Sequence, residues 1–122
     1  MILIVEEDEE MRSALEAILV HWGYPVLAVS NSVEGLNLYR KQLTEIRLVI
    51  SNISQNTNSL EDLRQLRTMN GNARVIFEGN CFDAETRRSL ASEGAAGFLF
   101  KPYTPEELRR VLSSELGDPP TP

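Results

Sequence analysis

The chain has 122 residues, of which 42% are apolar and 25% charged, and its formal net charge is −6. This length suits one domain with a proper core and leaves no room for a second. The negative charge argues against general binding to nucleic acids or anionic membranes, because both need a basic surface. No apolar run is as long as a membrane span and no signal-peptide pattern precedes the first strand, so we expect a cytoplasmic protein.

The first ten residues change abruptly in chemistry. An apolar run at residues 2–5 ends in five consecutive acids at residues 6–10. A short apolar run followed by a helical pattern is typical of a strand buried on both faces of a parallel sheet. Acids at its carboxyl end lie where open α/β sheets bind ligands, and we assign Glu6 and Glu7 to a site for a metal ion or a phosphorylated group bridged by one. Asp8 is the predicted N-cap of the next helix.

Short apolar runs alternate with amphipathic segments along the rest of the chain. We predict strands at 2–5, 24–29, 48–53, 74–77 and 97–100. We predict helices at 9–22, 33–43, 60–66, 83–93 and 105–116. Capping residues are expected within 30–32, at Ser59 and at Thr104. The helix at 83–93 has the weakest apolar stripe, so we expect it to be the most mobile helix or part of a contact surface.

Alternation of this kind implies parallel βαβ units with right-handed connections. We therefore predict an α/β domain over residues 1–116: a single doubly wound, five-stranded parallel sheet of (βα)5 type, with the strand at 24–29 at an edge. Residues 117–122 are predicted to be a flexible tail or linker. In the usual switch-point order, the ends of strands one, three and five meet at one edge of the sheet. The polar residues at those ends are Glu6, Glu7, Asn52 and Lys101.

Four stretches carry a pattern shared with a known family: ILIVEEDE at 2–9, WGYPV at 22–26, LVI at 48–50 and GAAGFLFKPY at 94–103. Over residues 2–116 the chain resembles the receiver domain of response regulators in two-component signalling, a CheY-like domain of flavodoxin-like fold. The Lys-Pro-aromatic sequence after the fifth strand is the specific part of this match. The AAGFL stretch and the TPEEL that follows at 104–108 are similar to receivers of hybrid sensor histidine kinases.

The resemblance implies a bacterial signalling protein of a phosphorelay, which is not an enzyme. Its partner would be a sensor histidine kinase or another signalling protein, either of which can belong to the same polypeptide in full length, and the family leaves room for a homodimer. Neither a nucleic acid nor a membrane is expected as a partner of this domain. The single cysteine, Cys81, lacks a plausible catalytic partner, and we interpret it as an incidental loop residue.

The resemblance also implies roles for individual residues. In the family, an aspartate at the end of the third strand accepts a phosphoryl group from a kinase histidine. Mg²⁺ held by acids of the first strand, together with a lysine, offsets the charge on the transferring oxygens. By position, the roles fall to Glu6 and Glu7 as the acid pair, the Ser54 backbone carbonyl as a metal ligand, Lys101 as a phosphoryl contact, Pro102 as the cis proline that aims it, Phe98 as the switch aromatic and Tyr103 as a structural aromatic.

The chain departs from the family pattern at the site itself. The acceptor position holds Asn52, whose carboxamide is neither a useful nucleophile nor a charged metal ligand. The Ser/Thr position after the fourth strand falls on Gly79; a shift of register there would put Glu78 or Asn80 in its place, also without a hydroxyl. The usual Met-Pro is replaced by Gln-Asn at 55–56. We predict a pseudo-receiver with weak Mg²⁺ binding at most, which signals through the surface of its fourth helix, fifth strand and fifth helix.

Other interpretations stay open at this point. A competent receiver could use another acceptor, such as Ser51 or Ser54. A flavodoxin-like cofactor binder would have the same strand order, but a flavin phosphate needs a Gly/Ser/Thr-rich loop where this chain has five acids. Lys101 could serve only as the counterion of a neighbouring acid, Asn52 could hydrogen-bond turn backbone, and Phe98 could be a core aromatic.

Overall fold

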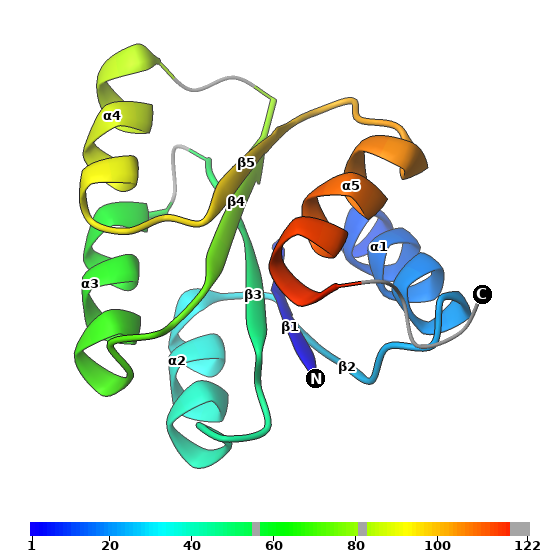
Figure 1. The fold of residues 1–122 in the computed structure, drawn as a ribbon, viewed down its shortest axis with the longest axis horizontal. Helices are drawn as coiled ribbons and strands as arrows, with labels where there is room; N and C mark the ends of the chain where they lie inside the picture. The colour runs from blue at the N-terminus through cyan, green and yellow to red at the C-terminus, as the bar shows by residue number, and fades with distance from the viewer. Residues whose placement is uncertain (55–56, 81–82, 118–122) are drawn as a thin grey trace.

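The computed structural model describes residues 1–54, 57–80 and 83–117, in which five strands alternate with five helices (Figure 1). The strands are β1 (Ile2–Val5), β2 (Val26–Val29), β3 (Leu48–Asn52), β4 (Val75–Gly79) and β5 (Gly97–Phe100). The helices are α1 (Glu9–His21), α2 (Ser32–Lys41), α3 (Ser59–Met69), α4 (Ala84–Ser92) and α5 (Pro105–Leu116). The predictions for Cys81, for residues 55–56 and for the tail at 118–122 lie outside the described residues.

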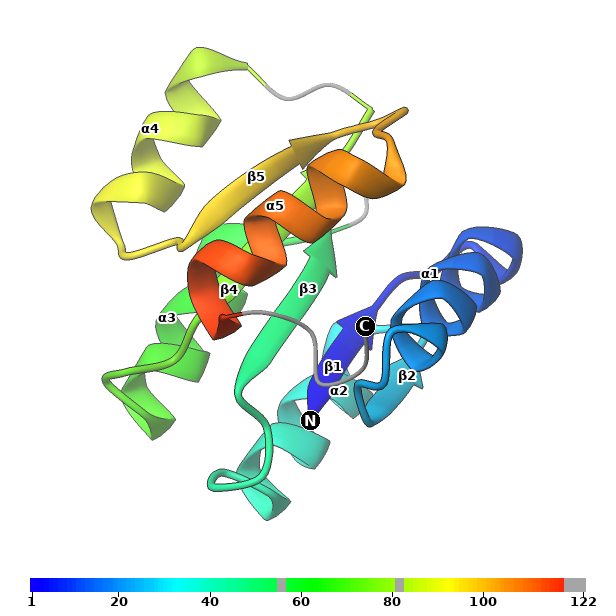
Figure 2. The ribbon, with the colours of Figure 1, turned by 45° about the vertical axis from the view of Figure 1, so that its right-hand side comes forward.

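The strands form one parallel sheet in the order β2-β1-β3-β4-β5. Helices α1 and α5 cover one face of this sheet, and α2, α3 and α4 cover the other (Figures 1 and 2). The predicted doubly wound α/β fold is confirmed, with β2 at an edge. Because the order reverses between β1 and β3, the carboxyl ends of these two strands flank the crevice where such sheets bind ligands.

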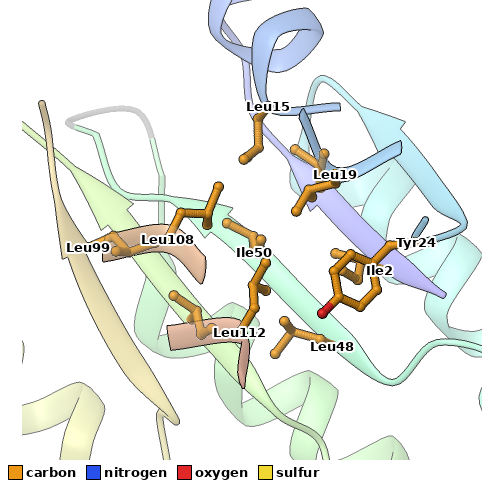
Figure 3. Packing of buried hydrophobic residues seen from close by; sticks show 11 residues of the cluster. Ile2, Leu15, Leu19, Tyr24, Leu48, Ile50, Leu99, Leu108 and Leu112 are labelled. Atoms are coloured by element: carbon orange, nitrogen blue, oxygen red, sulfur yellow. The ribbon is translucent and has the colours of Figure 1, made fainter. Parts of the chain in front are cut away.

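Two apolar cores, one on each face, explain why the strands are unbroken apolar runs. On the first face, Leu15 and Leu19 of α1 and Leu108 and Leu112 of α5 point into one cluster with Ile50 of β3 (Figure 3). Along each strand, residues that face the first core alternate with residues that face the second. The buried members of the second core on β1, β3 and β4 are Leu3, Val49, Val75 and Phe77. A strand enclosed on both faces has no need for polar positions until it ends.

Helix starts follow the predicted capping chemistry with one exception. The Asp8 carboxylate accepts the Met11 N–H at 3.1 Å, and the Thr104 hydroxyl oxygen accepts the Glu107 N–H at 3.0 Å. The prediction of Ser59 as a cap is wrong: α3 begins at Ser59, and its N-cap is the preceding asparagine. Both residue types cap helices, so the sequence pattern alone does not distinguish neighbouring positions.

Several predicted bounds also differ from the structure, among them the start of β2, which lies at Val26, and the end of α2, which lies at Lys41. Strand β4 continues through Glu78 and Gly79, two residues beyond its predicted end, because both remain paired with β5 and fully enclosed. Helix α3 continues to Met69, three residues beyond its predicted end. On α4, Leu90 is the buried residue, in keeping with the weak apolar stripe seen in its sequence. Within the described ranges, no helix is both long and apolar enough to cross a membrane.

Candidate functional site

Lys101 is the centre of a buried polar cluster at the carboxyl edge of the sheet. Its Nζ donates to Glu6 Oε1 at 2.7 Å and to Asn52 Oδ1 at 2.9 Å. Glu6 directly follows β1, Asn52 ends β3, and Lys101 directly follows β5. The structure therefore brings together three of the four residues that the topology predicted to meet. The Lys101–Pro102 peptide bond is cis, the geometry that the family resemblance implied.

The two acids of the predicted pair have different surroundings. Glu6 is only 1% exposed, and its second carboxylate oxygen accepts the Asp8 N–H at 3.2 Å. The Arg12 side chain donates to the Glu6 backbone carbonyl at 2.9 Å, which holds the turn between β1 and α1. Glu7 is exposed and borders an open hollow of about 590 Å³ beside Lys101. The pair thus divides into a buried partner of the lysine and a surface acid.

Glu78 is the second buried carboxylate of the cluster. The sequence predicts no role for it except as an alternative to Gly79 at the family's Ser/Thr position. It is 0% exposed and lies opposite Asn52 in the β3–β4 register. Its Oε2 accepts the Tyr103 hydroxyl at 2.5 Å, and its Oε1 lies 3.9 Å from Lys101 Nζ. Among the described residues, Oε1 has no hydrogen-bond donor. In the sequence, the feature that could have identified Glu78 is the presence of an acid within the otherwise apolar β4 segment VIFEG.

Burial dominates the ionisation of Glu78 and Tyr103. Desolvation raises the pKa of Glu78, and the Tyr103 hydrogen bond and the Lys101 charge oppose that rise. Desolvation and the facing Glu78 carboxylate raise the pKa of Tyr103. Tyr103 therefore remains a neutral hydroxyl donor at ordinary pH, and two carboxyl groups share the neighbourhood of one ammonium.

The remaining predicted residues are distributed over both faces of the sheet. Gly79 is buried, and its carbonyl accepts the Lys101 N–H at 2.7 Å, so it contributes backbone to the site and no hydroxyl. Phe98 lies on the opposite face, where its ring stacks with that of Phe77 at 6.5 Å between centroids. The Arg87 guanidinium lies 5.4 Å from the centre of the Phe98 ring.

The two serines considered as alternative acceptors also face different ways. Ser51 is buried and borders a small space beneath α2. It faces away from the Lys101 cluster because Asn52, the next residue of β3, points to the opposite face. Ser54 borders the open hollow together with Asn52 and Lys101. The Ser54 carbonyl, the predicted metal ligand, accepts the Thr57 hydroxyl at 2.9 Å.

The donor atoms around the hollow suit a hard cation only in part. Carboxylate, carboxamide and carbonyl oxygens are the ligands that Mg²⁺ prefers. However, Glu6 Oε1 and Asn52 Oδ1 both accept from the Lys101 ammonium, so a metal ion bound to these oxygens would lie close to a positive charge. In the described part of the chain, no group of three or more His, Cys, Asp or Glu side chains is arranged to hold a metal.

Comparisons with known proteins bear on this geometry. The family model described as response regulator receiver domain matches residues 2–113. The transcriptional regulatory protein ZraR of Klebsiella oxytoca is 26% identical over 115 residues, which cover 94% of this chain and 26% of that protein. The sensor kinase CckA of Brucella abortus (strain 2308) is 25% identical over 116 residues, which cover 94% of this chain and 12% of that protein. The chain thus spans about a quarter or less of these relatives.

Solved structures match over nearly the whole chain. A response regulator receiver domain protein of Clostridium thermocellum has a TM-score of 0.88 at 23% identity, covering 94% of this chain and 92% of the other. The receiver domain of a sensor histidine kinase of Pseudomonas aeruginosa PAO1, which has a magnesium ion coordinated in its active site cleft, has a TM-score of 0.81 at 21% identity, covering 96% and 97%. At these identities, the likeness establishes a common fold.

Proposed function

This chain belongs to the response regulator receiver family of two-component signalling, and from that premise we propose that it is a pseudo-receiver. In this role it does not accept a phosphoryl group at Asn52 and transmits its signal through contacts with other proteins. It is then a binding module and not an enzyme. The observation that carries the proposal is the pairing of Lys101 Nζ with Asn52 Oδ1 at 2.9 Å, beside the buried Glu6.

The chemistry of the acceptor position supports this role. A carboxamide oxygen is a poor nucleophile, and it cannot supply the negative charge that helps to hold Mg²⁺. Gly79 offers a backbone carbonyl where a hydroxyl would follow the phosphoryl oxygens. Lys101 already faces two carboxyl groups, from Glu6 and Glu78, so less of its charge is free to stabilise an incoming phosphoryl group.

The proposed partner is a sensor histidine kinase or another signalling protein, free or within the same polypeptide. The likeness to a sensor kinase and to transcriptional regulators, each much longer than this chain, supports a modular role. We assign the contact surface to α4, β5 and α5. There the Phe100 side chain is 42% exposed, with the Arg87 guanidinium 5.3 Å from its ring centre. The proposal includes a cytoplasmic location and no nucleic-acid or membrane partner for this domain, and it leaves room for a homodimer.

Magnesium has a minor place in this function. The family fold and the magnesium-bound relative from Pseudomonas aeruginosa suggest binding at the same edge, through Glu6, Glu7, Asn52 and the Ser54 carbonyl. A bound Mg²⁺ would offset negative charge on oxygens at the mouth of the hollow. Because Lys101 already occupies Glu6 and Asn52, we propose that this binding is weak.

The direct test is intact mass after incubation with acetyl phosphate and Mg²⁺, with peptide mapping of any adduct. We expect no adduct on the wild-type chain. The rival acceptor is Ser54, because it borders the hollow beside Lys101. An adduct mapped to Ser54 and lost in Ser54→Ala would replace the proposal with a competent receiver.

A gain-of-function variant tests whether the whole site has lost its chemistry. Asn52→Asp restores a carboxylate at the acceptor position, and we expect poor labelling by acetyl phosphate because Gly79 and Glu78 are unchanged. Efficient labelling of Asn52→Asp would mean that a single substitution, rather than the whole site, separates this chain from a working receiver.

A further inference from the structure

We propose that Glu78 is a positioning residue that holds the loop between β5 and α5 in one arrangement, without help from a phosphoryl group. This inference rests on the proposed function, because a receiver that is not phosphorylated needs another determinant of the shape that it presents to partners. The carboxylate of Glu78 acts through two residues of that loop, Tyr103 and Lys101.

The place of Glu78 in the sheet puts its side chain under the loop. Glu78 and Asn52 are register partners on adjacent strands, so their side chains point to the same face of the sheet. This is the face that α1 and α5 cover, since Ile50 and Ile76, two residues earlier on each strand, belong to that core. At 0% exposure, Glu78 has no access to water, so its carboxyl oxygens must find polar partners within the protein.

The first contact fixes Tyr103. Its hydroxyl donates to Glu78 Oε2 at 2.5 Å. The Tyr103 ring packs on the core beneath α5. The next residue, Thr104, is the N-cap of α5 and accepts the Glu107 N–H. The hydrogen bond from Tyr103 to Glu78 therefore restrains the start of α5 from β4, although the two residues are 25 positions apart in the sequence.

The second contact restrains Lys101. Its backbone N–H donates to the Gly79 carbonyl at 2.7 Å, and its ammonium lies 3.9 Å from Glu78 Oε1 and 2.7 Å from Glu6 Oε1. The loop is thus attached to the end of β4 at both of its sides, at Lys101 before the cis proline and at Tyr103 after it. An acid at this one position of β4 couples the buried site to the surface that begins at α5.

Amide hydrogen exchange tests this role without any phosphodonor. We would compare the wild-type chain with Tyr103→Phe, Glu78→Leu and Glu78→Gln, following the amides of residues 101–108 other than the prolines at 102 and 105. Tyr103→Phe and Glu78→Leu should raise exchange severalfold in this segment, because each removes one side of the hydrogen bond. Glu78→Gln keeps an oxygen acceptor for Tyr103, so exchange in this variant should stay close to the wild-type rate. Rescue by Gln distinguishes positioning from simple filling of space, since Leu also fills it.

Tyr39→Phe is the matched control. The Tyr39 hydroxyl is likewise buried, and it accepts Asn70 Nδ2 at 3.2 Å between α2 and the end of α3. Its removal should leave exchange in residues 101–108 unchanged, although it also deletes one buried hydroxyl.

Two results would overturn the inference. One is unchanged exchange at 101–108 in Tyr103→Phe, a variant that loses a single oxygen atom and decides the question even if Glu78→Leu does not fold. The other is an increase spread evenly over the sheet amides, which would mean global destabilisation. Acetyl phosphate labelling is scored separately: an adduct on the wild-type chain contradicts the proposed function, whereas the exchange pattern alone decides the role of Glu78.

Discussion

Along β1, β3 and β4, the side chains on the two faces of the sheet differ at the carboxyl ends of the strands. On the face covered by α2, α3 and α4, the inward residues remain apolar or small to the strand ends, as Phe77 and Gly79 do on β4. On the face covered by α1 and α5, each row changes from isoleucine to a polar residue at the carboxyl edge. The rows end in Glu6 directly after β1, Asn52 on β3 and Glu78 on β4.

This difference separates a buried layer that contributes packing from a buried layer that ends in the candidate site. The inward-facing residues of the apolar face contribute packing, because none of the described residues buried there carries a charge. The polar ends of the other face are buried at a cost in solvation, which is offset by Lys101 and by hydrogen bonds. We therefore expect substitutions in the buried interior of the first face to affect stability, and substitutions at the polar ends of the second to change both stability and the loop that leads into α5.

The apolar face should show the largest loss of stability. Phe77→Ala removes a ring that is 0% exposed, and we expect the free energy of unfolding to fall by about 4 kcal/mol. Urea denaturation measures this loss. Val33→Ala, at a side chain that is 69% exposed, is the control and should change stability by less than about 0.5 kcal/mol. Similar losses for the two variants would contradict the assignment of the core.

Removing the cation from the polar face should cost nearly as much. Lys101→Met leaves Glu6 and Glu78 buried without the ammonium that faces them, and we expect a loss of about 3 kcal/mol. The matched control is Arg64→Ala, which breaks an exposed ion pair with Glu93 and should cost about 1 kcal/mol or less. Equal losses of stability for Lys101→Met and Arg64→Ala in urea denaturation would mean that Lys101 contributes no more than an exposed ion pair.

A close approach of helix to sheet on the apolar face predicts a smaller loss. A Cβ atom at Gly35 of α2 would lie 2.8 Å from Val5 Cγ2 of β1, and valine has little freedom to move aside. We expect Gly35→Ala to lower stability by about 1 kcal/mol, although alanine favours helix. Gly71→Ala, where a Cβ would meet nothing within 4 Å, should be close to neutral. A stabilising Gly35→Ala would show that α2 can shift freely.

The mildest chemical change concerns the charge of Glu78. Burial raises the pKa of Glu78 above its ordinary value of 4.5, so the folded chain binds more protons at this group than the unfolded chain. Its contribution to stability is fully present below pH 4.5 and is lost as the pH rises through the folded-state value. Glu78→Gln removes this dependence and keeps an acceptor for Tyr103.

The stability of wild type minus that of Glu78→Gln should therefore fall as the pH rises above 4.5. Urea denaturation at a series of pH values measures the difference. Glu106→Gln, at an exposed position of α5, controls for the loss of one surface carboxylate. A difference that grows with pH would mean that the charged form of Glu78 is favoured in the folded state.

The sequence by itself determined the architecture of this protein. Apolar runs enclosed on both sides, separated by amphipathic helices, specify a parallel sheet, because such strands can be buried only under helices on both faces. The strand order then follows a common rule, and it places Glu6, Asn52 and Lys101 at one edge. Local chemistry also identified Asp8 and Thr104 as caps, because a cap contacts amides only three residues away.

Only the tertiary structure decided which of these residues work together. Periodicity does not reveal that Glu6 turns inward while Glu7 remains at the surface, since both follow the strand directly. Nor does it reveal that an acid in β4 meets Tyr103, because that contact depends on the β5–α5 loop returning over the edge of the sheet. A local pattern specifies the face on which a side chain lies, whereas its partner is set by chain segments that meet only after the sheet has formed.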